Sequence, residues 1–171
     1  MKISRFLFAL SLVGSLPAAT VGFANITAST SMPVTTFPDS SFTVDRLVDG
    51  ISDDVPAPYN GFISDSVGVI SLTFSQTYNV NSFLLWNDIN VLNEGIEDFS
   101  LRFYDNANSQ ITVPFTADYT GPVGQIAAEE YLFPSIVNGV KRVELEVLTT
   151  QAAIVGGQPR TEIREVDFGV I

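Results

Sequence analysis

The sequence predicts an all-β fold in which two antiparallel layers form a sandwich. Apolar and polar residues alternate with period two along most of the chain after residue 24, and no stretch keeps a helical period. The alternating segments are short, and Gly, Pro, Asn and Asp residues separate them without intervening helices. Because a parallel sheet needs crossover helices, this pattern favours an antiparallel sandwich over any α/β fold.

The first 24 residues are typical of an export signal. A positively charged start precedes an apolar run, and the small residues Gly22 and Ala24 precede a cut before Asn25. An uncleaved membrane anchor is the alternative, but the apolar run is shorter than the roughly 20 residues of a spanning helix. We therefore expect a signal peptide at residues 1–24 and one secreted domain at residues 25–171, located outside the cell, in a periplasm or at the cell surface.

Alternation assigns one apolar face to each expected strand. In the stretch VELEVL, Val143, Leu145 and Val147 point to one side. The intervening Glu144 and Glu146 then face water. The expected strands cover residues 67–75, 81–88, 98–105, 111–115, 126–133, 143–148 and 164–170, with an eighth open at residues 26–30.

One of these strands, residues 111–115, contains Pro114. Proline has no backbone N–H to donate to a neighbouring strand, so it is found at sheet edges or at bulges. We therefore expect this strand to lie at an edge or to carry a bulge.

The composition excludes several classes of function. The chain of 171 residues carries a formal net charge of −11, and all 19 acidic residues follow residue 24. Such a surface repels nucleic acid and anionic membranes, because their binding depends on basic patches. The chain has no Cys and no His, which excludes disulfides, cysteine zinc sites and Ser-His-Asp triads. Neutral glycans and cations are the ligands that fit best.

Five motifs, in order and spacing, resemble the discoidin or coagulation-factor type C family of galactose-binding-like domains. They extend from Phe42 to Gly169 and read RLVDG, VGVISLTF with YNVNSFLLWND, GIEDFSLRFYD, NGVKRVELEVL and REVDFG. The resemblance implies an eight-stranded antiparallel jelly-roll sandwich whose loops at one end bind a sugar or another surface ligand. Many bacterial members of this family are carbohydrate-binding modules attached to glycosidases.

The stretch VDGISDD in this sequence offers oxygen ligands for a hard cation such as calcium, which takes six to eight of them. Members of the family often hold a structural calcium with a carbonyl before Asp-Gly, that Asp, later loop oxygens and a Glu of the last strand. The resemblance maps this set onto the Arg46 carbonyl, Asp49, Asp53, Asp54 and Glu165.

Two departures from the family pattern bear on this site. The Thr that commonly follows the Asp-Gly is absent, and Glu162 could replace Glu165 as the final ligand. A solvated turn without metal is the alternative, because Asp-Gly and Pro-x-Pro are ordinary turn sequences.

Three expected loops carry aromatic and amide residues suited to a sugar, which needs a flat apolar face and polar partners for its hydroxyls. Trp86 is the one tryptophan, and by alternation it shares a face with Leu84, so it is either a ligand contact or part of the core. The candidate ligand-binding residues are Tyr59, Asn60, Phe62, Trp86, Asn87, Asp88, Asn90 and Tyr119.

The sequence therefore predicts a non-catalytic secreted module that recognises glycans or cell-surface material, with a structural calcium. A structural or adhesive protein of the cell envelope, using the sandwich for protein contacts, is the alternative. A small glycoside hydrolase would need one carboxyl as acid and another as base or nucleophile. By residue type, its candidates are Asp53, Asp54, Glu94, Glu97, Asp98 and Asp118.

Overall fold

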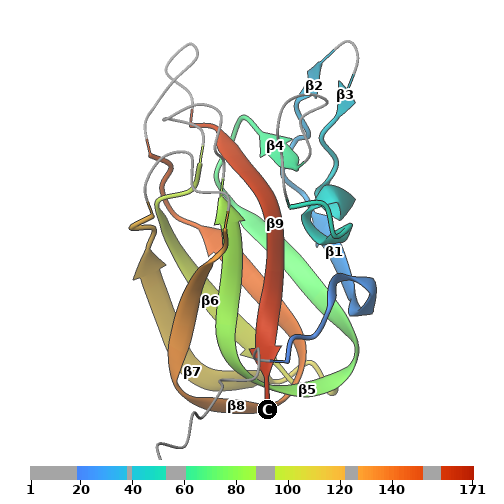
Figure 1. The fold of residues 1–171 in the computed structure, drawn as a ribbon, viewed down its shortest axis with the longest axis vertical. Helices are drawn as coiled ribbons and strands as arrows, with labels where there is room; N and C mark the ends of the chain where they lie inside the picture. The colour runs from blue at the N-terminus through green and yellow to red at the C-terminus, as the bar shows by residue number, and fades with distance from the viewer. Residues whose placement is uncertain (1–18, 38–39, 53–60, 88–94, 122–126, 152–158) are drawn as a thin grey trace, which may run out of the picture.

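The computed structural model describes residues 19–37, 40–52, 61–87, 95–121, 127–151 and 159–171 (Figure 1). Regular structure in these residues is β-strand, apart from two short 3-10 helices, η1 (Phe23–Asn25) and η2 (Val44–Val48). The strands are β1 (Ile26–Thr30), β2 (Thr36–Phe37), β3 (Ser40–Ser41), β4 (Phe62–Ser64), β5 (Val69–Asn87), β6 (Asp98–Tyr104), β7 (Gln110–Asp118), β8 (Glu129–Val147) and β9 (Thr161–Val170). Within the described part of the chain, no helix is long and apolar enough to cross a membrane.

The predicted antiparallel sandwich is confirmed, and two long strands, β5 and β8, build both of its layers. In the first layer, the early part of β5 pairs with β1 and with the late part of β8, which in turn pairs with β6; β7 follows β6. In the second layer, the late part of β5 pairs with the early part of β8 and with β9, and β4 follows β9. Figure 1 shows β5 and β8 curving from one layer into the other near the C-terminus.

The sequence prediction divided each long strand in two, and this division is wrong. Residues 67–75 and 81–88 contribute to one strand, β5, and residues 126–133 and 143–148 contribute to another, β8. The β5–β8 register shifts three times between Thr73 and Ser82. Irregularities of this kind bend a strand without ending its pairing, so Asn and Gly residues that resemble a turn lie instead in a bend.

The core lies between the layers and follows the predicted alternation. Ile70, Leu72 and Phe74 are at most 1% exposed, and Val143 and Leu145 are fully buried. Aromatic rings then join the two layers. The ring of Phe83 in the second layer lies 5.5 Å from that of Phe99 in the first, and 5.3 Å from that of Phe168. Such pairs stabilise a fold by about 0.5–1.5 kcal/mol beyond the area they bury.

Strand β7 is the edge strand that Pro114 predicted. It ends the strand order β4-β9-β5-β8-β6-β7, and its residues alternate between exposed and half-buried. Pro114 also lies where the β6–β7 register shifts between Leu101 and Phe103, and it has no paired residue in β6, so its missing N–H interrupts no regular pairing.

Candidate functional site

One end of the sandwich gathers the strand ends that flank the predicted binding loops. Strand β5 ends there at Asn87 and β7 at Asp118, while β6 begins at Asp98, β8 at Glu129 and β9 at Thr161. The antiparallel registers of these strands place the five residues at the same end, which is the upper end in Figure 1. We call this the loop end.

Glu165 on β9 reaches the acidic loop that the sequence identified as a cation site. Its side chain is fully buried, and its Oε1 accepts a hydrogen bond from the Gly50 N–H at 3.0 Å. Its other oxygen, Oε2, is buried and has no hydrogen-bond partner among the described residues. Burial raises the pKa of Glu165, the nearby Asp49 carboxylate acts in the same direction, and the resulting pKa is about 7 despite the lowering effect of the Gly50 and Ile51 N–H groups. Within the described residues, Glu165 Oε2 is therefore a buried carboxylate oxygen that no donor or cation contacts.

The loop opposite Glu165 is a tight turn after η2. Gly50 has φ of 84°, a left-handed conformation that glycine adopts without steric cost. Asp49 accepts a hydrogen bond from the Ile51 N–H at 3.0 Å, and its other oxygen lies 3.3 Å from the Arg46 guanidinium. The structure thus places Asp49 near Glu165, and the Arg46 guanidinium pairs with Asp49.

The predicted cation site also includes two acidic residues that follow Ile51 and Ser52. Asp53 and Asp54 fall outside the described residues. Among the residues that are described, no group of three or more Asp, Glu, His or Cys side chains could hold a metal ion. Calcium at this loop therefore stays a prediction.

Arg164 is a buried cation at the loop end that the candidate list omitted. Its side chain is 1% exposed, the Nε donates to the Asn87 carbonyl at 2.7 Å, and a terminal nitrogen donates to the Ser52 carbonyl. Ser52 precedes the expected loop that carries Tyr59 and Asn60, and Asn87 lies in the expected loop WNDINVLNEG. Alternation places Arg164 on the same face as Val166 and Phe168, but the β5–β9 register shifts at this residue, so its contacts follow only from the structure.

Two of the predicted ligand residues have structural roles. Phe62 is fully buried and presents no face to a ligand. Asn87 is 2% exposed, and its side-chain amide donates to the Ile96 carbonyl at 2.8 Å and accepts from the Ile96 N–H at 3.0 Å. The Asn87 side chain thus forms the two hydrogen bonds that the backbone of a neighbouring strand would form, and it holds Ile96 at the end of β5.

Two other predicted ligand residues keep part of their surface. Trp86 is half-buried on the face of β5 opposite Leu85, and its ring lies 5.9 Å from that of Phe23 at an interplanar angle of 61°. Tyr119, just after β7, is half-buried against the core, and its N–H donates to the Glu97 carbonyl at 2.9 Å. The remaining predicted ligand residues, Tyr59, Asn60, Asp88 and Asn90, lie outside the described residues.

A close carboxylate pair also lies at the loop end. Asp98 and Asp118 are direct partners across β6 and β7, and their side chains share a hydrogen bond. A hydrogen bond from Thr149 and the one from Asp118 lower the pKa of Asp98, whereas the bond with Asp98 and its charge raise the pKa of Asp118. Catalytic carboxyls of glycosidases stand about 5 Å or more apart to flank the sugar. This pair is too close for that role.

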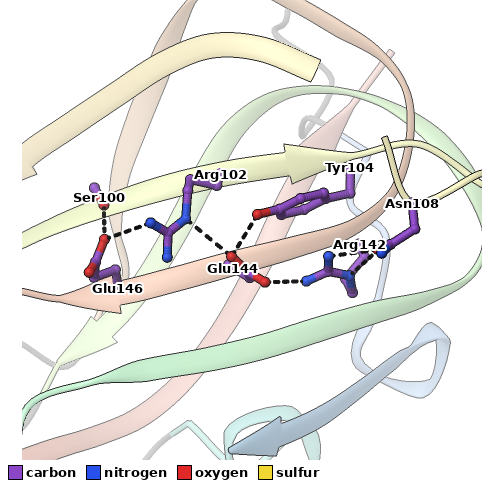
Figure 2. A network of polar contacts seen from close by, with 7 residues as sticks. All are labelled: Ser100, Arg102, Tyr104, Asn108, Arg142, Glu144 and Glu146. Carbon is purple, nitrogen blue, oxygen red and sulfur yellow. Dashed lines mark hydrogen bonds and ion pairs between the residues drawn. The ribbon is translucent and has the colours of Figure 1, made fainter. Parts of the chain in front are cut away.

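The outer face of the first layer carries a ladder of paired charges, shown in Figure 2. Arg102 lies 3.1 Å from Glu144 and 3.2 Å from Glu146, and Tyr104 donates to Glu144 at 2.8 Å. Arg142 pairs with Glu144 and stacks on the Tyr104 ring at 3.8 Å. Burial acts to raise the pKa of Glu144, but the hydrogen bonds from Arg142 and Tyr104 prevail and lower it. These charges therefore satisfy one another.

A groove of about 270 Å³ lies beside this ladder, between β6 and β7, lined by residues 100–102, 110 and 112–116. Arg102 is the positively charged residue that lines the groove, and its charge is already paired with Glu144 and Glu146. The groove is on the sheet face, away from the loop end.

Comparisons with known proteins define the fold. No family model and no curated protein matches the sequence. Among solved structures, a family 32 carbohydrate-binding module of a Clostridium perfringens glycoside hydrolase gives a TM-score of 0.68 at 12% identity, covering 89% of this chain and 95% of the module. An F5/8 type C domain from Bacteroides fragilis gives 0.68 at 11% identity, covering 88% and 95%. A fucose-binding module from Streptococcus pneumoniae gives 0.62 at 14% identity, covering 90% and 96%.

The chain therefore has the discoidin-type, galactose-binding-like β-sandwich fold. The resemblance seen in the sequence motifs is confirmed at the level of the fold.

Proposed function

We propose that this protein is a secreted, non-catalytic module that binds glycans through the loop end. The observation that carries the proposal is the fold, because the structures that share it include a carbohydrate-binding module and a fucose-binding module. The formal net charge of −11 also supports neutral glycans over nucleic acid and anionic surfaces.

The strand ends and loop stems at the loop end, Ser52, Asn87 and Ile96, are held by side-chain hydrogen bonds, which supports a binding role. The buried Arg164 guanidinium joins the carbonyls of Asn87 and Ser52, and the Asn87 amide fastens Ile96. Stems that are ordered before a ligand arrives reduce the entropy lost on binding. In this proposal, aromatic rings cover the apolar side of a sugar while amides and a carboxylate bind its hydroxyls. The residues assigned to these roles are Tyr59, Asn60, Asp88, Asn90 and Tyr119.

A glycan array probed with the exported protein tests this function. We expect binding to neutral glycans, and we expect Tyr59→Ala and Tyr119→Ala each to weaken it by roughly tenfold or more, as loss of a central aromatic contact does. Gln76→Ala is the matched control, because Gln76 is exposed where β5 changes layers. No binding to any glycan would contradict the function. Binding that both tyrosine variants leave intact would contradict the assigned site.

We further propose a structural calcium ion at the acidic loop. Glu165 Oε2 fits a cation, because it is buried and has no hydrogen-bond partner among the described residues, and burial of the carboxylate raises its pKa. Asp49, Glu165, the Arg46 carbonyl and the Asp53–Asp54 pair would hold the ion. When bound, it would supply positive charge to these oxygens and join the loop to β9.

Thermal unfolding with and without a chelator tests the metal. We expect the melting temperature to fall when EGTA replaces calcium, and we expect Glu165→Gln to remove most of that difference. The Asp65→Asn variant is the control, because Asp65 is exposed and pairs with Arg160. Identical melting curves in calcium and EGTA would contradict the metal and leave the glycan proposal standing.

A further inference from the structure

The residues just before β1 pair with the end of β9. The Val170 N–H donates to the Ala19 carbonyl at 2.8 Å, and the Val21 N–H donates to the Phe168 carbonyl at 2.9 Å. Thr20 forms an antiparallel bridge with Gly169, and Val21 is 3% exposed within the core cluster. Residues 19–21 therefore pair with β9 through an isolated antiparallel bridge, although the sequence pattern assigned them to the signal peptide.

Asp167 depends on this segment for its hydrogen bonds. The side chain is 2% exposed, and its Oδ1 accepts from the Gly22 N–H at 3.1 Å and from the Phe168 N–H at 2.8 Å. The Thr20 side chain bonds to it as well. Loss of residues 19–24 would remove two of these three donors from a buried carboxylate, which is unfavourable.

Phe23 extends the contact to the acidic loop. Its ring lies edge-on against Trp86, and a Cβ placed on Gly50 would lie 3.3 Å from it. Phe23 therefore sits between Trp86 and the glycine whose N–H holds Glu165. Gly22 has φ of 79°, which turns the chain from the segment beside β9 into η1 and brings Phe23 to this position.

We propose that residues 19–24 are a permanent part of the folded domain and that export processing cuts the chain at or before the Ala18–Ala19 bond. A cut before Asn25 would delete the contacts that residues 19–24 make with β9, with Trp86 and with Gly50. The small residues Ala18 and Ala19 offer an earlier position. In the mature protein, Phe23 then covers Trp86 and supports the acidic loop. This inference depends on neither the glycan nor the calcium proposal.

The N-terminus of the exported protein tests the inference directly. The full chain is expressed with its own leader, and the exported product is analysed by intact mass and N-terminal sequencing. We expect a first residue at Ala19 or earlier within a cleaved leader. A first residue at Asn25, or an uncleaved Met1, would overturn it.

A Phe23→Ala variant of the full chain gives a second, independent measurement. If residues 19–24 are retained, the exported variant should melt roughly 2 to 8 °C lower, and its tryptophan emission should shift to longer wavelength, since Trp86 is the one tryptophan. Ala24→Ser is the control, because Ala24 is exposed. If the cut lies before Asn25, the mature proteins are identical in sequence and cannot differ. Identical melting and emission would therefore overturn the proposal.

Discussion

At the scale of the residue, Glu165 shows how the fold changes the chemistry of one carboxyl. Two backbone N–H groups of the turn, those of Gly50 and Ile51, favour its charged form, but burial outweighs them and its pKa rises to about 7. A carboxyl in this state holds a proton near neutral pH unless a cation takes the place of that proton. Its protonation thus becomes coupled to folding and to any bound metal.

This coupling predicts a pH dependence in the absence of calcium. The pKa of Glu165 is higher in the folded state, about 7, than its ordinary value of 4.5, so the stabilisation is present below pH 4.5 and is lost as pH rises through 7. A shift of this size corresponds to about 3 kcal/mol. Urea unfolding in EGTA should therefore give a lower free energy of unfolding at pH 8 than at pH 5.

Glu165→Gln separates this effect from that of other carboxyls. Burial also raises the pKa of Asp167, which contributes in the same direction. In the Gln variant, the free energy of unfolding should keep only the pH dependence that Asp167 and the exposed acids supply. In the natural chain, added calcium should reduce the pH dependence. An equal pH dependence in both proteins would show that Glu165 is not the group responsible.

At the scale of the element, β9 is covered on both faces. Val166 and Phe168 pack inward, Glu165 meets the acidic loop, and Asp167 meets residues 20–22. Nine of its ten residues are consequently buried. A strand rich in charges can lie in the middle of the second layer because Arg164, Glu165 and Asp167 each bond to backbone groups of other segments.

Arg164 provides the test at this scale. Arg164→Met should lower the free energy of unfolding by about 2–4 kcal/mol, because it leaves the buried Asn87 carbonyl and the partly buried Ser52 carbonyl without this donor. Arg160→Met is the matched control on the adjoining segment. Its exposed pair with Asp65 is worth about 0–1 kcal/mol. Equal losses in urea unfolding would contradict the bridging role of Arg164.

At the scale of the whole molecule, β5 and β8 make the two layers one cooperative unit. Each strand passes through the bend and pairs in both layers, so neither layer can lose its strands while the other keeps them. The aromatic contact between Phe83 and Phe99 joins the layers through the core as well.

This continuity predicts one unfolding transition. Trp86 fluorescence reports the second layer, while circular dichroism reports strands of both layers. Their urea curves should coincide in midpoint and slope, as expected for a two-state domain. A fluorescence transition that precedes the loss of β-structure would show that the second layer unfolds separately.

The sequence predicted the fold more completely than the candidate site. Alternation assigned the faces of β6 and β8 correctly, and Pro114 placed β7 at an edge. It assigned Phe62 and Asn87 to a ligand, because residues beside Gly and Asp resemble loop residues. Phe62 pairs with Ile163 of β9, and Asn87 bonds to Ile96, so the burial of both residues depends on contacts that no strand pattern shows.

The sequence by itself determined which side chains of each strand turn inward, because a pleated strand alternates its side chains whatever it pairs with. Only the tertiary structure decided that β5 and β8 run through both layers, that Arg164 joins two loop stems, and that residues 19–24 cover β9. The contacts of Gly50 with Glu165 and of Gly22 with Asp167 span 115 and 145 positions of the chain. No local pattern encodes such pairs, because they form only when the layers close.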